Sequence, residues 1–317
     1  MRTITALFVG LGSIGTRHLK NLANLCADRG WTLQADALRS DLTRPLRPGA
    51  AELLHAQYTA PAAAPAHYDM VFITNPTSLH AEALRQVKGR GEALFIEKPI
   101  FSAEQTGLAL DELLPAGQKA YVAAPMRWCG VMLALKDRLP ALHPYCARVI
   151  CSSYLPDWRP GVDYRTVYSA RKALGGGVTI DLIHEWDYLV ELFGVPEKLY
   201  NFKGTYSELE IDSDDLSVYI AKYPTLLAEV HLDYFGRGYR RSIELFCRDG
   251  SYLADFGKGT LTLPDGTVQH YEEDVNRRYE REMEYFVDYA LTGCGESCNP
   301  PALALKVLKL TLGENVQ

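Results

Sequence analysis

The sequence predicts an α/β fold, with a doubly wound parallel sheet in its N-terminal part and an open, largely antiparallel sheet in its C-terminal part. Two observations support this: strands and helices alternate as far as residue 124, and strand follows strand from Lys198 onwards. At 317 residues the chain exceeds one ordinary core, so we expect two domains, residues 1–124 and 125–317. The closing helices pack either with the second domain or back on the first.

The first part opens with a β-branched, apolar strand at Thr3–Val9, followed by a helix over Thr16–Ala27 with leucines at helical spacing. A second strand is expected at Thr32–Leu38. A Pro/Ala-rich stretch separates it from Met70–Thr74, an unbroken apolar run typical of a strand buried on both faces. The alternation then continues with a helix, a strand, a helix and a strand, at Ser78–Val87, Ala93–Ile96, Glu104–Leu114 and Lys119–Ala124.

The alternation ends near Met126. We expect a helix over Met132–Leu139, a strand over Cys146–Tyr154 and a long helix over Val178–Phe193. Asp-Gly pairs at 249–250 and 265–266 mark hairpin turns. The later strands are expected at Lys198–Lys203, Leu216–Lys222, Leu226–Tyr234, Arg241–Arg248, Ser251–Phe256 and Thr260–Leu263, and the closing helices at Arg278–Leu291 and Ala302–Leu312.

Composition excludes several classes of protein. A net charge of −6 and a pI near 5.8 argue against a general nucleic-acid binder, which needs a basic face. No apolar run is long enough to span a membrane, and the N-terminus lacks the apolar region of a signal peptide, so we expect a cytoplasmic protein. The cysteines form no Cys-x-x-Cys pair, so we expect no metal site, and Cys294 and Cys298 are interpreted as two free thiols in a loop.

A Gly-x-Gly-x-x-Gly turn separates the first strand from the first helix. Gly10 permits the tight turn, Gly12 lets a pyrophosphate approach the main chain, and Gly15 lets helix and strand pack closely. The helix that begins around Ser13 and Ile14 offers unpaired N–H groups and the positive end of its dipole to phosphates. A turn that binds nothing is the alternative. The strand before and the helix after favour dinucleotide binding.

The residue at the end of the second strand should contact the 2′ group of that dinucleotide. An acidic residue there would favour NAD. This chain has Arg39 followed by Ser40, and a guanidinium with a hydroxyl suits a 2′-phosphate. We therefore expect NADP or NAD with NADP favoured, while Asp36 and Asp41 nearby keep NAD open.

Three side chains could carry hydride-transfer chemistry. Oxidising an alcohol with a nicotinamide needs a base for the hydroxyl proton and a cation for the developing alkoxide. Lys98 ends a predicted strand, where such sheets bind ligands, and Pro99 would fix its backbone. Asp181 and His184, three apart on a predicted helix, share a face, and His184 can take the proton. A surface lysine and an ordinary helical pair are the alternatives.

Aromatic and basic side chains crowd the segment that precedes the glycine triplet at 175–177. Aromatic faces suit sugar rings, and guanidinium groups suit carboxylates or phosphates. We expect a polar, anionic or nucleotide-linked sugar as substrate, in contact with Trp158, Arg159 and Tyr164. An interdomain or subunit-interface loop explains the same residues equally well. The segment contains Tyr154, Asp157, Trp158, Arg159, Tyr164, Tyr168, Arg171 and Lys172.

Four motifs together resemble the glucose–fructose oxidoreductase / inositol dehydrogenase / MocA family. They are the glycine turn, Glu97-Lys98-Pro99, the run Gly-Gly-Gly-x-x-x-Asp-x-x-His over Gly175–His184, and Thr74-Asn75-Pro76-Thr77-Ser78-Leu79-His80. The resemblance covers most of the chain. It implies an N-terminal Rossmann domain and a C-terminal α/β domain whose open sheet often forms oligomer contacts.

The resemblance also implies site residues. Lys98 and His184 correspond to catalytic residues, and Asp181 to a residue beside the substrate. The segment around Arg127 keeps an arginine of the family pattern but departs from it elsewhere, and Arg127 is assigned to the substrate. Besides the glycine turn, the cofactor contacts are assigned to Arg39, Ser40, Thr74, Asn75, Pro76, His80, Glu97 and Lys98.

The favoured function is hydride transfer between NAD(P) and a hydroxyl or carbonyl of a sugar, sugar acid, cyclitol or nucleotide sugar. A reductase of a non-sugar ring on the same fold is one alternative, since fold does not fix function. A non-catalytic NAD(P)-binding sensor is another, although it would need none of Lys98, Asp181 and His184. We expect no nucleic-acid or membrane partner, and a homodimer or homotetramer formed through the C-terminal sheet.

Overall fold

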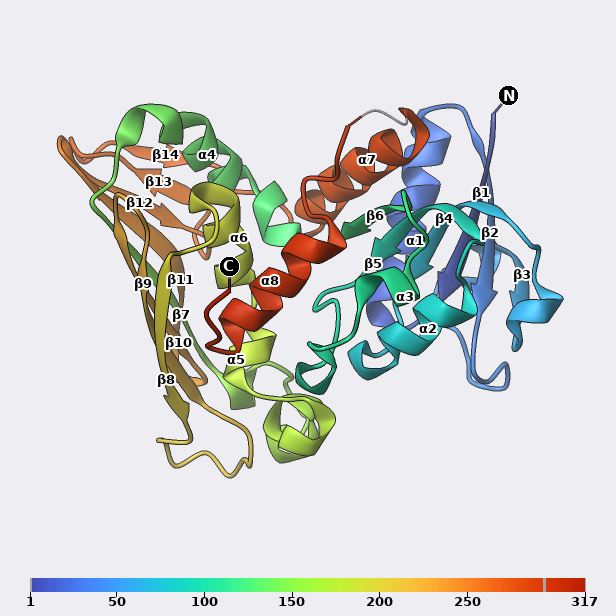
Figure 1. Ribbon diagram of the computed structural model, residues 1–317, viewed down its shortest axis with the longest axis horizontal. Helices are drawn as coiled ribbons and strands as arrows, with labels where there is room; N and C mark the ends of the chain where they lie inside the picture. Colours follow the sequence, from blue (N-terminus) through green and yellow to red (C-terminus); the bar gives the residue numbers. More distant parts are fainter. Residues whose placement is uncertain (1, 293–294, 317) are drawn as a thin grey trace. The chain divides into compact units, whose positions relative to one another are not determined.

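The computed structural model describes residues 2–292 and 295–316 and divides the chain into two compact units (Figure 1). The first consists of Met1–Ala123 and Tyr279–Leu305, and the second of Ala124–Arg278 and Lys306–Gln317. Residues of both closing helices, α7 (Asn276–Thr292) and α8 (Pro301–Thr311), are therefore divided between the units. Cys294 lies outside the described residues.

A six-stranded parallel sheet forms the centre of the first unit. Its strand order is β3-β2-β1-β4-β5-β6, so the expected doubly wound parallel sheet is confirmed. In this order the topology reverses between β1 and β4, where such sheets bind dinucleotides. The strands are β1 (Thr3–Val9), β2 (Thr32–Leu38), β3 (Leu54–Tyr58), β4 (Tyr68–Ile73), β5 (Gly91–Ile96) and β6 (Lys119–Val122).

Helices cover both faces of this sheet. Figure 1 shows α1 (Ser13–Asp28) behind it and α2 (His80–Gln86) with α3 (Leu110–Leu113) in front. On the α1 face, Phe95 of β5 contacts Phe286 of α7, with ring centroids 5.2 Å apart. Apolar strands covered on both faces explain the unbroken hydrophobic runs that predicted β4 and β5.

Two expectations are wrong in this unit. The helix expected over Glu104–Leu114 is reduced to a 3₁₀ turn at Ala103–Gln105 and the single turn α3. Gly107, which disfavours helix, lies between them. The stretch between Pro45 and Pro65, for which no strand was expected, contains β3. An edge strand is covered less than a central one, so β3 carries no continuous apolar run.

The second unit is built on an eight-stranded sheet in the order β14-β13-β12-β11-β7-β10-β9-β8. Only β7 and β10 pair in parallel among the described strands, which confirms an open, largely antiparallel sheet. The strands are β7 (Cys146–Tyr154), β8 (Lys198–Gly204), β9 (Leu216–Lys222), β10 (Leu227–Asp233), β11 (Phe235–Cys247), β12 (Gly250–Asp255), β13 (Thr260–Thr262) and β14 (Val268–His270).

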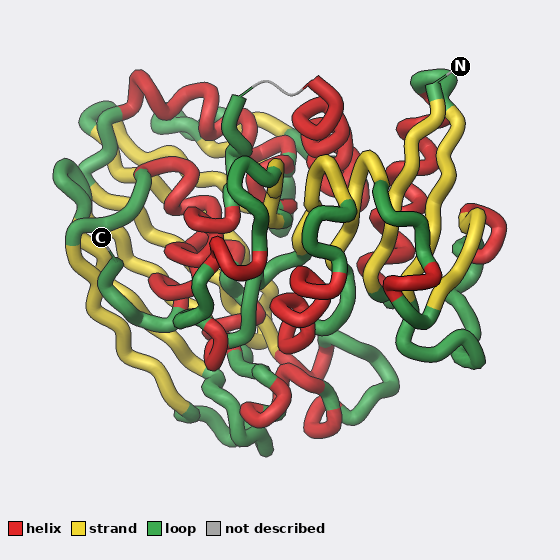
Figure 2. Tube along the Cα trace, turned by 45° about the vertical axis from the view of Figure 1, so that its right-hand side comes forward, coloured by secondary structure: helices red, strands yellow, loops and turns green. Residues whose placement is uncertain are grey.

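Helices of this unit pack on one face of the sheet (Figure 2). They are α4 (Gly130–Leu142), α5 (Val178–Asp181) and α6 (His184–Phe193). On this face Trp186 of α6 meets Tyr219 of β9 with ring centroids 5.1 Å apart. The opposite face carries the side chains that alternate with these buried ones.

The long helix expected over Val178–Phe193 is wrong, because the helix is interrupted at Leu182 and Ile183. Asp181 therefore ends α5 and His184 begins α6, so the expectation that they share a face of one continuous helix fails. Tertiary bonds on either side of the break override the local helical pattern: Asp181 binds tyrosines and Glu185 binds Arg241. In the sheet, β11 begins six residues before the expected Arg241, and β14 was not expected.

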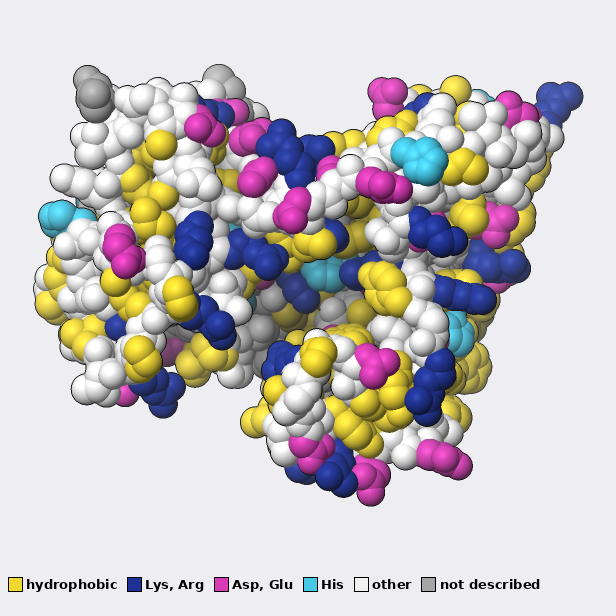
Figure 3. Space-filling model, turned by 180° about the vertical axis from the view of Figure 1, so that it is seen from behind, with side chains coloured by type: hydrophobic (Ala, Val, Ile, Leu, Met, Phe, Trp, Pro, Cys, Tyr) yellow, Lys and Arg dark blue, Asp and Glu magenta, His cyan; other side chains and the backbone are white. Residues whose placement is uncertain are grey.

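Two properties of the described residues concern membranes and metal ions. Along the described residues, no helix combines the length and the apolar character that crossing a membrane requires. The same residues hold no cluster of three or more His, Cys, Asp or Glu side chains suited to a metal ion. On the side seen in Figure 3, basic and acidic side chains are interspersed among hydrophobic ones.

Candidate active site

The three glycines of the turn after β1, Gly10, Gly12 and Gly15, have different surroundings. Gly10 has a φ of +81°, and a Cβ there would lie 2.7 Å from Asn75 Cα. A Cβ at Gly15 would lie 2.6 Å from Thr74 Oγ1, so this glycine lets α1 approach β4 closely. A Cβ at Gly12 would meet no atom within 4 Å, which places this backbone against open space.

The start of α1 fits a pyrophosphate group. No side chain caps the helix, and its first turn contains no acidic residue. The N–H groups of the first turn, which includes Ser13 and Ile14, therefore remain available to an anion at the positive end of the helix dipole. Together with the open space at Gly12, this arrangement fits the phosphates of a dinucleotide.

The loop after β4 lies beside that turn. The hydroxyl of Thr74 donates to the carbonyl oxygen of Gly10, 2.5 Å away. His80 is buried, with Nε2 3.0 Å from the Asn75 carbonyl oxygen and Nδ1 3.1 Å from that of Ile100. Burial lowers the pKa of His80. His80 thereby connects this loop to the segment after Pro99, and cofactor contacts by Thr74, Asn75, Pro76 and His80 stay predictions.

Glu97 and Lys98 follow β5 at the same edge of the sheet. His18 Nε2 lies 2.6 Å from Glu97 Oε1, and the Lys98 backbone N–H donates to Glu97 Oε2 at 3.0 Å. Burial acts to raise the pKa of Glu97, but the bond to His18 and the charge of Lys98 outweigh it and lower that pKa. The Lys98 side chain is half-buried, and the peptide bond to Pro99 is cis.

Arg39 directly follows Leu38, the last residue of β2. The carbonyl oxygen of Leu38 accepts a hydrogen bond from the Gly10 N–H. The Arg39 guanidinium donates to Gln57 Oε1 at 2.7 Å and to the carbonyl oxygen of Arg44. A surface hollow of about 380 Å³ is lined by Arg39, Arg44, Arg47 and Gln57, among others. Ser40, next in the chain, is exposed.

The two acidic residues that kept NAD open are engaged elsewhere. Asp36 is buried and accepts from the Tyr68 hydroxyl at 2.8 Å, with His55 Nδ1 at 3.2 Å. Asp41 accepts from the hydroxyl and the backbone N–H of Thr43, which lower the pKa of Asp41. Neither carboxylate occupies the position directly after β2.

In the second unit, two tyrosines hold Asp181. Tyr168 donates to Asp181 Oδ1 at 2.7 Å, and Tyr234 donates to Oδ2 at 2.5 Å. Burial, together with the carboxylate, raises the pKa of both phenols, so they remain protonated donors. The Trp158 ring meets Tyr234 edge-on at 5.2 Å, and the Arg159 guanidinium lies 5.8 Å from the centre of the Tyr168 ring.

The predicted substrate residues of this unit are thus partly gathered. Trp158, Arg159 and Tyr164 line one small hollow, and the first two contact the tyrosines that hold Asp181. His184 is half-buried at the start of α6. The next residue, Glu185, is fully buried and paired with Arg241 at 2.7 Å, which anchors that end of α6 to β11.

Arg127 is buried in an ion-pair network. Its guanidinium binds Asp187 and Glu191 of α6, each at 2.7 Å, and Lys136 binds the other oxygen of Glu191. These bonds attach the segment Pro125–Trp128 to α6. They give Arg127 a structural role, and its assignment to the substrate stays a prediction.

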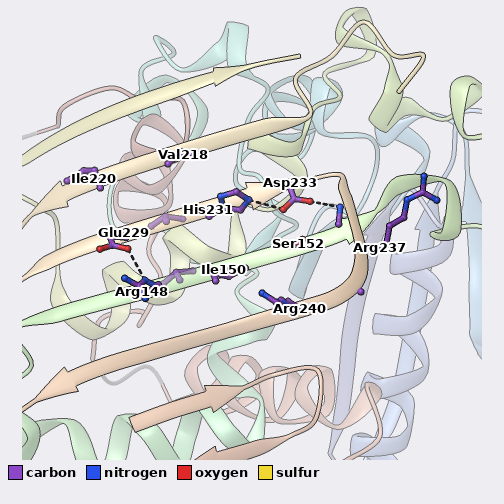
Figure 4. Close-up of a pocket in the computed structure, with 14 residues that line it drawn as sticks. Arg148, Ile150, Ser152, Val218, Ile220, Glu229, His231, Asp233, Arg237 and Arg240 are labelled. Atoms are coloured by element: carbon purple, nitrogen blue, oxygen red, sulfur yellow. Dashed lines mark hydrogen bonds and ion pairs between the residues drawn. The ribbon is translucent and has the colours of Figure 1, made fainter. Parts of the chain in front are cut away.

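A larger hollow of about 610 Å³ lies on the face of the eight-stranded sheet opposite the helices (Figure 4). Arg148 Nε donates to Glu229 Oε2 at 2.9 Å, and His231 Nε2 lies 2.9 Å from Asp233 Oδ2. None of the residues predicted to form the site lies in this hollow.

Sequence reasoning missed His18 and Tyr234, and it did not connect Tyr168 with Asp181. A signal existed for His18, because it lies one turn before Leu22 on the buried stripe of α1. Tyr234 gave no such signal, since it is 53 residues from Asp181.

Residues 4–123 match the model of an oxidoreductase family with an NAD-binding Rossmann fold, GFO_IDH_MocA, which confirms the resemblance inferred from the motifs. A comparison with curated proteins finds no match.

Several solved structures share the fold. An oxidoreductase from Agrobacterium radiobacter in complex with NAD+, L-tartaric acid and magnesium is 17% identical with a TM-score of 0.80, over 98% of this chain and 95% of that chain. UDP-N-acetylglucosamine 3-dehydrogenase from Acidithiobacillus ferrooxidans is 18% identical, with a TM-score of 0.73 over 99% and 97%. Myo-inositol 2-dehydrogenase from Lactobacillus plantarum is 19% identical, with a TM-score of 0.75 over 98% and 96%. At these identities the likeness shows the fold alone.

Proposed function

We propose that this chain is an NAD(P)-dependent oxidoreductase of the glucose–fructose oxidoreductase / inositol dehydrogenase / MocA type, and that Lys98, Asp181 and His184 carry its reaction. The match of residues 4–123 to an oxidoreductase family with an NAD-binding Rossmann fold supports the proposal. The proposed substrate is a sugar, sugar acid, cyclitol or nucleotide sugar in the cytoplasm. The observation that supports the proposal best is the Asp181 carboxylate held by two tyrosines, three residues before a half-buried histidine.

The bound nicotinamide would accept the hydride from the substrate carbon, or supply it in the reverse direction. His184 would hold the proton of the reacting hydroxyl, and the Lys98 ammonium would stabilise the charge that develops on its oxygen. Both carboxylate oxygens of Asp181 accept hydrogen bonds from phenols, which fixes the orientation of the side chain. It would orient His184 or accept from a neighbouring substrate hydroxyl.

We propose NADP as the preferred cofactor. Arg39 occupies the position directly after β2, and two further arginines, Arg44 and Arg47, line the same hollow. The carboxylates of Asp36 and Asp41 are occupied by the protein. A 2′-phosphate would therefore meet guanidinium groups and the Ser40 hydroxyl rather than a competing acid.

A substrate panel tests the activity. D-glucose, D-glucuronate, myo-inositol and UDP-glucose are each incubated with the protein and NADP+ or NAD+, and the change in nicotinamide absorbance is followed. We expect oxidation of at least one compound, fastest for an anionic or nucleotide-linked sugar because Arg159 lies exposed beside Tyr168. Cofactor binding with no turnover of any compound, in either direction, would support a sensor instead.

We also propose that a second copy of the chain covers the open face of the C-terminal sheet, giving a homodimer or homotetramer. Exposed apolar side chains occupy this face on three neighbouring strands: Tyr200 and Phe202 of β8, Ile220 of β9 and Leu227 of β10. Such a row on a sheet face marks a contact surface. Light scattering should show a dimer or tetramer that becomes a monomer in Phe202→Glu. A monomeric wild-type protein would contradict the proposal.

A further inference from the structure

A buried pair of titratable side chains lies beneath Lys98, outside the reaction described above. His18 belongs to α1, the helix whose start fits the pyrophosphate, and none of its surface is exposed. Glu97 follows β5 and is 8% exposed. The two meet at 2.6 Å, between His18 Nε2 and Glu97 Oε1.

Glu97 joins that histidine to the lysine. One carboxylate oxygen contacts the imidazole, and the other accepts the backbone N–H of Lys98 at 3.0 Å. A buried carboxylate needs such partners, because an ion without them is costly to bury. A single rigid group therefore connects the cofactor helix to the backbone of the lysine.

The imidazole itself has little freedom to move. Its ring packs on Phe95 of β5 at 4.7 Å between centroids, and Tyr279 of α7 meets its edge at 6.1 Å. Among the described residues Nδ1 has no hydrogen-bond partner, so the bond through Nε2 is the polar contact that fixes the ring. Removing this ring would free one oxygen of Glu97 while leaving the lysine in place.

We propose that His18 is a positioning residue: through Glu97 it holds the backbone of Lys98 in register with the helix that binds the cofactor phosphates. The inference rests on the proposed role of Lys98. It assigns His18 no contact with substrate or nicotinamide. Its expected contribution is to turnover rather than to the affinity for the cofactor, since neither His18 nor Glu97 lies at the open start of α1.

The first test measures position without turnover. Amide hydrogen exchange at Lys98 is compared in the wild type, His18→Leu and His18→Gln, because a glutamine amide can replace the Nε2–H donor. We expect Lys98 exchange to be about tenfold faster in His18→Leu and within about threefold of wild type in His18→Gln. The amide of Val122, which donates to the Asn299 carbonyl oxygen at 3.0 Å, is the internal control and should not change. Equal exchange at Lys98 in all three proteins would overturn the inference, as would equal acceleration at Val122.

The second test connects position to the reaction. Kinetics are measured on the panel compound that is oxidised fastest, and NADPH affinity by fluorescence titration. His18→Leu should lower kcat about tenfold and leave the Kd for NADPH within about threefold, with recovery in His18→Gln. In a Lys98→Ala background, the same change should have no further effect on kcat, because the group that it positions is gone.

The two proposals fail in different ways. If Lys98→Ala keeps normal turnover, the proposed role of Lys98 is wrong, and the role of His18 in the reaction falls with it. If Lys98→Ala lowers turnover but leaves it measurable, and the loss from His18→Leu multiplies with it, the inference about His18 alone is wrong. The same holds if kcat does not change in His18→Leu. If no panel compound reacts, Lys98 exchange still decides whether His18 positions its backbone.

Discussion

The two units build their functional groups in different ways. In the first unit, backbone groups form most of the proposed cofactor-binding surface, which consists of glycines, strand ends and the start of α1. The residues of this surface lie directly after β1, β2, β4 and β5. In the second, side chains from distant parts of the chain converge on one carboxylate, as Tyr168 and Tyr234 do on Asp181. The first arrangement is readable as a motif, and the second becomes visible only when the sheet has folded.

The largest effect should come from the residues proposed to carry the reaction. We expect His184→Ala to lower kcat on the order of 10²–10⁴-fold through loss of the proton-accepting group. Lys98→Ala, in the first unit, should lower kcat by a similar factor, because the ammonium group that stabilises the developing charge is lost. Steady-state kinetics on the panel substrate measure both, with exposed Lys222→Ala as the control. Near-normal turnover in both variants would contradict the proposed roles of His184 and Lys98.

In the first unit, where backbone groups form most of the proposed cofactor surface, Arg39 is one of the few side chains proposed to contact the 2′ group of the cofactor. Arg39→Ala should weaken NADP+ binding about 10–100-fold, because charge-assisted hydrogen bonds to the phosphate are lost. Binding of NAD+ should change little. Titration of intrinsic fluorescence with each cofactor gives the two Kd values, and Arg148→Ala on the eight-stranded sheet is the matched control. A strong preference for NAD that persists in Arg39→Ala would contradict the assignment.

In the second unit, the two tyrosine hydroxyls that donate to Asp181 can be removed one at a time. Tyr234→Phe should lower the free energy of unfolding by about 1.5–3 kcal/mol, because a buried carboxylate loses a donor at 2.5 Å. Tyr168→Phe should cost less, since 43% of that residue is exposed and water can replace its hydroxyl. Urea unfolding of both variants and the wild type measures the difference. Equal losses would show that burial does not distinguish the two bonds.

The glycine turn separates folding from binding within one motif. Gly15→Ala should destabilise the protein by about 1–3 kcal/mol, because its Cβ would meet Thr74 and the Gly10 carbonyl oxygen. Gly12→Ala should cost at most about 1 kcal/mol of stability, since its Cβ meets no protein atom, yet it should weaken cofactor binding. Thermal unfolding and cofactor titration together check the pair. A stable Gly15→Ala protein would contradict the close packing of α1 on β4.

Much of the parallel sheet could be predicted, because strands buried on both faces leave continuous apolar runs and the glycine turn marks a strand–helix junction. The edge strand β3 escaped prediction because partial exposure removes that run. The break between α5 and α6 also escaped, since the local pattern is helical and the contacts that interrupt it come from elsewhere in the fold.

By itself the sequence determined the resemblance to an oxidoreductase family, the doubly wound sheet, and the places where Gly10, Lys98 and His184 occur along the chain, because each depends on local spacing. The tertiary structure decided which groups surround them: His18 beneath Glu97, Tyr234 on Asp181, and Asp36 turned away toward Tyr68. The physical reason is that a buried charge must find donors wherever the packed chain brings them, and those donors obey no spacing rule.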